Sequence, residues 1–148
     1  MASPEPTNAK NGTHTALLIS SETQDHDMLS CLFQRHGWSL QSADCFDSAS
    51  AILQQAPISV VVTERDLPTG NWKDVLEASH GLRTVPLVIV ISRFADDYLW
   101  AEALNLGVYD VLLKPLQESE VVRVLTSAWI RVSPDSPKAR RGKGPEAA

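Results

Sequence analysis

Four positions that could carry chemistry each follow directly after a short apolar run. They offer hydroxyls, a carboxylate and an amine: Ser20 and Ser21 after Thr15–Ile19, Glu64 after the run from Ile58, Ser92 after Pro86–Ile91, and Lys114 after Tyr109–Leu113. An acid, a hydroxyl and an amine in one crevice could support hydrolysis, but a lysine beside a carboxylate more simply forms a salt bridge. We therefore predict that Glu64 and Lys114 pair, and we do not expect an enzyme.

The stretch from Ile58 to Pro68 has the pattern of a central strand. Val60, Val61 and Val62 follow one another without a polar break, whereas a strand with one face in water alternates apolar and polar residues. The run therefore predicts a parallel sheet that is covered on both faces. In such sheets ligands bind outside the carboxyl ends of the strands, which makes Glu64 the first candidate for a site.

The remaining chain predicts five strands that alternate with five helices. The strands are Thr15–Ile19, Ser39–Ala43, Ile58–Glu64, Pro86–Ile91 and Tyr109–Leu113, and the helical apolar faces include Leu29, Leu53, Val75, Ala103 and Leu125. Gly37 and Gly107 predict helix ends, and Asn71 and either Asp47 or Ser48 predict helix starts. Short connections make these βαβ units. We predict an α/β, flavodoxin-like doubly wound fold with a five-stranded parallel sheet of strand order 2-1-3-4-5.

Length and charge suit one folded domain with polar ends. The chain has 148 residues, 43% of them hydrophobic, and a net charge of −5. We predict a disordered segment over residues 1–13, a folded domain over 14–132 and a disordered basic tail over 133–148. The tail carries a charge of +2, which leaves −7 on the remainder. An acidic body argues against specific nucleic-acid binding.

The sequence lacks the usual signals of several other classes of protein. Residues 1–13 have no apolar core for secretion, and the longest apolar run, Leu87–Ile91, is too short to cross a membrane. Cys31 and Cys45 form no disulfide framework or metal spacing, which fits the reducing cytoplasm. The four histidines are scattered, and no glycine-rich loop follows the first strand. We expect a cytoplasmic protein with no bound metal or cofactor.

The order of the four positions resembles the receiver domain of two-component response regulators. In that family the first strand ends in an acid pair that holds Mg²⁺, the third in the phospho-accepting Asp, the fourth in Ser or Thr, and the fifth in Lys-Pro. The corresponding residues here are Ser20 and Ser21, Glu64, Ser92, and Lys114 with Pro115, and Pro68 lies four residues after Glu64. The resemblance covers about residues 14 to 131 and implies that Ser92 and Lys114 are the phosphate-pocket equivalents.

The departures from the family predict a receiver that is not phosphorylated. Hydroxyls at Ser20 and Ser21 supply neither the charge nor the affinity that Mg²⁺ needs. Glu64 has one methylene more than the family's acceptor and can imitate an aspartyl phosphate, with Ser92 and Lys114 contacting its carboxylate. We expect Glu22 to face water at the start of the helix. Val111 stands where the family carries an aromatic residue that moves on phosphorylation.

The resemblance implies a stand-alone, divergent receiver that acts by binding a signalling protein, such as a histidine kinase or an output protein. The family's output face, formed by the fourth helix, the fifth strand and the last helix, would offer Tyr98 or Trp100, Tyr109, and Arg123 or Arg131, and could form a homodimer. The alternative is an active phosphoacceptor or a small phosphohydrolase that uses Asp66 or Glu22 in an irregular pocket.

The tail from Ser133 onward is predicted to be dispensable for folding. Pro134, Pro137 and Pro145 interrupt regular structure, and no apolar periodicity remains to be buried. Deleting the tail should leave the free energy of unfolding in urea unchanged within about 0.5 kcal/mol. A loss of several kcal/mol would show that the tail packs on the domain.

Overall fold

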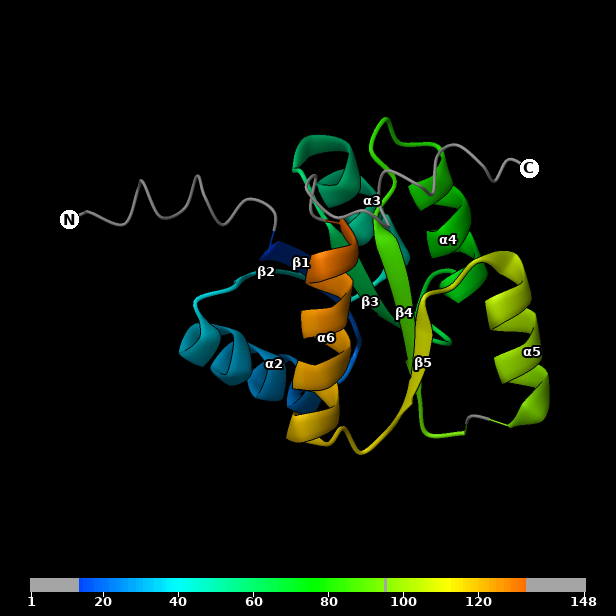
Figure 1. Cartoon of the computed structure of the whole chain (residues 1–148). Coiled ribbons are helices and arrows are strands. Elements are labelled where there is room, and N and C mark those ends of the chain that lie inside the picture. Colours follow the sequence, from blue (N-terminus) through cyan, green and yellow to red (C-terminus); the bar gives the residue numbers. More distant parts are fainter. Residues whose placement is uncertain (1–13, 95, 133–148) are drawn as a thin grey trace.

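The sheet of the computed structural model has the predicted topology. The structure describes residues 14–94 and 96–132. Five parallel strands lie in the order β2-β1-β3-β4-β5, which confirms the flavodoxin-like fold (Figure 1). The segment 1–13 and the tail 133–148, both predicted to be disordered, lie outside the described residues.

Strands and helices alternate through the described chain. In order they are β1 (Thr15–Ile19), α2 (Thr23–His36), β2 (Ser39–Ala43), α3 (Phe46–Gln55), β3 (Val60–Glu64), α4 (Trp72–His80), β4 (Leu87–Ser92), α5 (Asp97–Leu106), β5 (Asp110–Leu113) and α6 (Glu118–Val132). None of the helices in this described part has the length and apolar character that crossing a bilayer requires.

Two apolar cores lie on the two faces of the sheet. Val60 and Val62 belong to the core that α2 and α6 cover, whereas Val61 belongs to the core under α3, α4 and α5. Figure 1 shows α6 lying across one face, with α4 and α5 beyond the other. Each face of β3 therefore has its own apolar cover, which is why the run of valines does not alternate with polar residues.

The glycine and asparagine signals for helix ends are confirmed. Gly37 and Gly107 close α2 and α5 with φ of 72° and 103°, in the left-handed region that glycine adopts without a steric penalty. Asn71 starts α4 with a capping box: its side chain accepts from the backbone N–H of Lys73 and Asp74, and Asp74 accepts from the backbone N–H of Asn71.

The predicted cap of α3 at Asp47 or Ser48 is wrong. The helix begins at Phe46, after Cys45, and has no side-chain cap from its own N-terminus. Instead the hydroxyl of Thr69, in the loop after β3, accepts from the backbone N–H of Phe46 at 3.1 Å and of Asp47 at 3.4 Å. A cap supplied from a distant loop leaves no local sequence signal.

The capping role of Asn71 can be tested by mutation. Asn71→Ala removes the acceptor for two backbone N–H groups and should lower the free energy of unfolding by about 0.5–2 kcal/mol. Glu77→Ala, on the exposed side of the same helix, is the control and should change it by less than about 0.5 kcal/mol. Urea unfolding of the two variants measures the difference, and equal values would contradict the capping role.

Candidate functional site at the carboxyl edge of the sheet

Strand pairing brings the predicted site residues to one edge of the sheet. Ser20 follows β1, Glu64 ends β3 opposite Ile91, and Ser92 ends β4 opposite Leu113. The backbone N–H of Lys114 donates to the carbonyl of Ser92 at 2.8 Å. All parallel strands point the same way, so these residues lie together outside their carboxyl ends.

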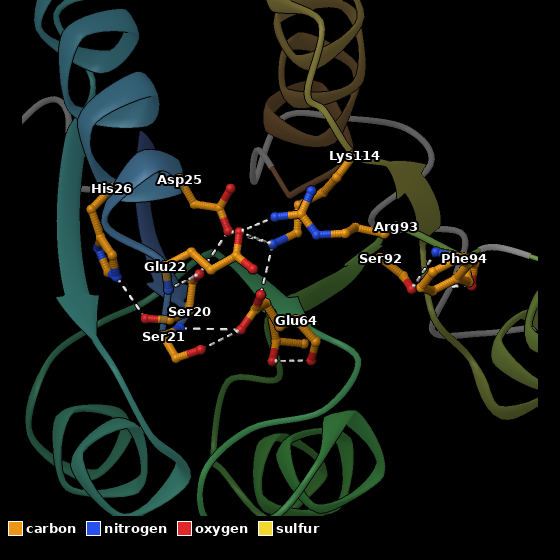
Figure 2. Close-up of polar contacts among 11 residues, drawn as sticks. Ser20, Ser21, Glu22, Asp25, His26, Glu64, Ser92, Arg93, Phe94 and Lys114 are labelled. Atoms are coloured by element: carbon orange, nitrogen blue, oxygen red, sulfur yellow. Dashed lines mark hydrogen bonds and ion pairs between the residues drawn. The ribbon is translucent and has the colours of Figure 1, made fainter.

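The Lys114 side chain lies at the centre of the site. Its Nζ donates to Glu64 Oε2 at 2.6 Å, to Asp25 Oδ2 at 2.8 Å and to Glu22 Oε1 at 3.1 Å (Figure 2). The Lys114 side chain is only 4% exposed and that of Glu64 11%. The predicted contact between Glu64 and Lys114 is therefore present, and it is buried.

Both oxygens of the Glu64 carboxylate have partners. While Oε2 accepts from Lys114, Oε1 accepts from the backbone N–H of Ser21 at 3.1 Å and from its hydroxyl at 3.2 Å. The side chain is thus held from two sides, by the loop after β1 and by the residue after β5. This restricts the carboxylate to one position.

Asp25 is a central residue of the site that the sequence reasoning missed. It is buried in the first turn of α2, and its Oδ2 accepts from the Ser20 hydroxyl at 2.6 Å as well as from Lys114. The signal was available, because Asp25 precedes Met28 and Leu29 by three and four residues and so shares the apolar face of the helix. A carboxylate on a buried face needs a partner, and here that partner is Lys114.

Glu22 lies in the site, so the expectation that it faces water is wrong. Its Oε1 accepts from Lys114 and, at 2.7 Å, from the guanidinium of Arg93, and the side chain is 35% exposed. The hydrogen bond from Arg93, followed by that from Lys114, lowers the pKa of Glu22 below its usual value. Arg93 has no signal in the sequence, since it is a half-exposed residue of the loop after β4.

The three carboxylates also determine the protonation of Lys114. Burial acts to lower its pKa, but the hydrogen bonds to Asp25, Glu64 and Glu22 outweigh burial and raise the pKa above its ordinary value. The side chain is therefore an ammonium group at neutral pH.

Ser92 makes no hydrogen bond to Glu64 in the described structure. Its hydroxyl donates to the carbonyl of Phe94 and accepts from the backbone N–H of Phe94, both at 3.1 Å. Ser92 does not cap the next helix either, because Asp96 caps α5 by accepting from Leu99 N–H at 3.0 Å. A turn within its own loop uses the serine hydroxyl instead.

Two further predicted positions lie outside the charged cluster. Val111 is 3% exposed and packs in the core under α3, α4 and α5. The Asp66 side chain is 84% exposed in the loop after β3, where its nearest described ionic partner is Arg65 at 3.8 Å. Asp66 is therefore a solvated loop residue.

The residues at the acid-pair positions do not suit a magnesium ion. The hydroxyls of Ser20 and Ser21 donate to Asp25 and Glu64 and thus orient the carboxylates rather than replace them. The carboxylates of Glu22, Asp25 and Glu64 have oxygens within 4.8 Å of one another, but Lys114 Nζ contacts one oxygen of each. The Lys114 ammonium therefore already supplies these carboxylates with a cationic partner.

Comparison with known proteins identifies a family. The family model described as "Response regulator receiver domain" matches residues 17–126. The transcriptional regulatory protein DcuR of Shigella flexneri is 30% identical over 110 residues, which are 69% of this chain and 46% of DcuR. The chain thus spans about half the length of that curated relative.

Solved structures show the same fold at low sequence identity. A CheY-like response regulator receiver domain protein from Methanospirillum hungatei JF-1 is 17% identical, with a TM-score of 0.73 over 80% of this chain and 94% of that one. Full-length FixJ from B. japonicum is 19% identical, with a TM-score of 0.77 over 90% of this chain and 66% of that one. With a family match over most of its described residues, the chain belongs to the response regulator receiver domain family.

Proposed function

We propose that this receiver domain signals by binding a protein partner in a state held by Glu64, and that it does not accept a phosphoryl group. The observation that carries the proposal is the buried contact of Glu64 with Lys114 and Ser21, at the strand end where the family has its acceptor Asp. A carboxylate fixed there presents a permanent negative charge in the crevice. The domain then has one stable state where its relatives have two.

The chemistry of the crevice supports an unphosphorylated domain. Phosphoryl transfer needs positive charge placed against the equatorial oxygens of the transferred group. The Lys114 ammonium is already shared by three carboxylates, and the serines that replace the acid pair serve as hydrogen-bond donors. The same saturation of the polar groups supports our view that the domain is not an enzyme.

The surface formed by α5, β5 and α6 is the proposed partner site. Tyr98 is 85% exposed on α5, and Leu104 and Leu106 of the same helix are 49% and 43% exposed. On the neighbouring elements the guanidinium of Arg131 lies 5.9 Å from the ring centre of Tyr109. Exposed aromatic and apolar side chains beside arginines suit a protein partner.

The kind of partner follows from the family and the charge. A histidine kinase, an output protein or a second copy of this chain fits this surface, whereas the acidic body disfavours nucleic acid. We place the domain in the cytoplasm, where such partners work. The idea that it acts as a stand-alone chain stays a prediction.

One observation favours the alternative function. Glu22 lies in the crevice, although the sequence reasoning placed it in water, and a hollow of about 180 Å³ reaches from Glu22 and Glu64 to Asp66 and Ser92. An active phosphoacceptor or phosphohydrolase would use Glu22 or Asp66 there. The phosphorylation experiment below distinguishes this alternative from the proposed function.

The contact between Glu64 and Lys114 should be energetically strong, because it is buried. Lys114→Met leaves three carboxylates without their shared counter-charge and should lower the free energy of unfolding by about 3–5 kcal/mol. Glu64→Gln should cost less, because Lys114 keeps Asp25 and Glu22 as charged partners. In a double-mutant cycle in urea we expect an interaction energy of about 0.5–3 kcal/mol.

An exposed pair of the same types serves as the control for this cycle. Lys73 and Glu102 lie 2.5 Å apart, with side chains about half exposed, and their interaction energy should stay below about 1 kcal/mol. An interaction energy of zero for Glu64 and Lys114 would remove the contact as the basis of the fixed state.

Restoring the family's acceptor should not by itself make the domain phosphorylatable. Glu64→Asp shortens the carboxylate and weakens its reach to Lys114 and Ser21, while the hydroxyls of Ser20 and Ser21 still offer no charged metal ligand. After incubation with acetyl phosphate and Mg²⁺, intact mass should show no hydroxylamine-labile adduct on the wild type or on this variant.

The positive comparison is the triple variant Ser20→Asp, Ser21→Asp and Glu64→Asp, in which an adduct becomes possible. A stoichiometric adduct on the wild type would support the alternative function, and its loss in Asp66→Asn or Glu22→Gln would identify the acceptor. An adduct on the Glu64→Asp variant alone would mean that the crevice binds the metal by another route.

A further inference from the structure

The two edge strands of the sheet differ in how open they are to another chain. Among the described strands, β2 pairs only with β1, and β5 pairs only with β4 (Figure 1). An edge strand presents unpaired N–H and C=O groups to which a further strand can add, and proteins prevent this with charged side chains, proline or a bulge. An edge strand that lacks all of these is open to strand addition.

The edge at β5 is blocked. The backbone N–H of Lys114 donates to β4, and neighbouring residues of a strand direct their backbone groups to opposite sides, so the N–H of Val111 points to the outer edge. The Asp110 carboxylate accepts from this N–H at 2.7 Å. An outward donor is therefore already used, and a negative charge lies beside it.

The edge at β2 carries no such block. The strand Ser39–Ala43 contains neither a charged residue nor proline, and its pairing with β1 runs through all five residues without a bulge. The side chains of Gln41 and Ser42 are exposed. This part of the strand is therefore open to solvent and has none of the usual features that prevent strand addition.

The backbone groups of Leu40 and Ser42 point away from β1. The carbonyl of Ala43 accepts from the Ser20 N–H at 3.0 Å, so Ala43 faces the strand side of β1. Because neighbouring residues direct their N–H and C=O groups to opposite sides, those of Leu40 and Ser42 lie along the outer edge. The edge thus offers two donors and two acceptors, placed symmetrically on either side of Gln41.

This edge is complementary to itself. In an antiparallel ladder, opposed residues at alternate positions exchange both of their N–H···O=C bonds. If two copies of β2 pair about a two-fold axis at Gln41, Leu40 of each copy exchanges both bonds with Ser42 of the other, and the two Gln41 residues face each other between them. All outward backbone groups of Leu40 and Ser42 are then satisfied, as a two-fold symmetric interface requires.

The charges beyond the two ends of β2 favour the antiparallel arrangement. Arg35 and His36 stand before the strand, at the end of α2, whereas Asp44 and Asp47 follow it; Arg35 also pairs with Glu118 of α6. Antiparallel pairing brings the basic end of one copy beside the acidic end of the other, while parallel addition would bring like charges together. The acidic chain can therefore meet a second copy here without like charges opposed.

We propose that this chain forms a two-fold dimer in which two β2 strands pair antiparallel and join the two sheets into one. The inference goes beyond the proposed function, because the surface formed by α5, β5 and α6 lies at the other edge of the sheet and stays free. It also differs from the homodimer that the resemblance implied, which would use that surface. The dimer presents two copies of the proposed partner site, one at each end.

Sedimentation equilibrium of the full chain tests the dimer. The wild type should dimerise, and Gln41→Lys, which places two like charges opposite each other at the axis, should raise the dissociation constant at least tenfold. Gln117→Lys makes the same change of charge at an exposed residue after β5 and should change it less than threefold. Equal weakening by both substitutions overturns the proposal. So does a wild type that stays monomeric at every soluble concentration, which would leave β2 to an extended segment of another protein.

A disulfide across the axis tests the register. The Cα atoms of a non-hydrogen-bonded antiparallel pair lie about 4.5 Å apart, a distance that a disulfide can span. With Cys31 and Cys45 changed to serine, Gln41→Cys should give a covalent dimer on mild oxidation. Ser39→Cys should stay monomeric, because its two copies lie four residues out of register, about 14 Å apart along the ladder. Equal cross-linking of the two variants, or none with Gln41→Cys, overturns the proposal.

Discussion

The attraction between one ammonium group and three carboxylates holds the crevice together. Glu22, Asp25 and Glu64 would repel one another strongly at their observed separation if no cation lay among them. Lys114 is supplied by the end of β5, two of the acids by the start of α2 and the third by β3. The contact thus joins three parts of the chain that are far apart in sequence. It lies at the carboxyl ends of the strands, where the backbone pairing of the sheet ends.

The two serines that follow β1 orient two of the three carboxylates. Ser20 donates to Asp25 and accepts from the backbone N–H of Glu22, whereas Ser21 donates twice to Glu64. Each serine therefore orients an acid that stands elsewhere. The acids of this cluster thus stand at the start of α2 and the end of β3, and the hydroxyls that follow β1 donate to them.

The fold could be predicted closely because its signals are local or repetitive. The continuous valines of β3, the glycine ends of α2 and α5 and the cap at Asn71 each act within a few residues. The strand ends that carry Glu64 and Lys114 followed from the topology, so their contact could be predicted as well. Its burial could not, because that depends on side chains from α2.

The missed parts of the site depend on contacts between distant segments. Asp25 was identifiable in principle as an acid on an apolar helical face, but its partner lies 89 residues further along the chain. Arg93 reaches Glu22 across 71 residues from a half-exposed loop position, which no periodicity marks. Ser92 was misassigned because a serine at a strand end can equally turn toward its own loop, as it does toward Phe94.

The cap that Thr69 supplies to α3 places the capping requirement of this helix on the loop after β3. Because the acceptor comes from another loop, Cys45 and the first residues of α3 carry no capping duty of their own. The constraint falls instead on the loop after β3, where Gly70 has φ of 86° and a side chain there would meet the Cβ of Phe46 at 3.1 Å. Substitutions of Thr69 or Gly70 should therefore disturb both the start of α3 and the path that the chain takes away from Glu64.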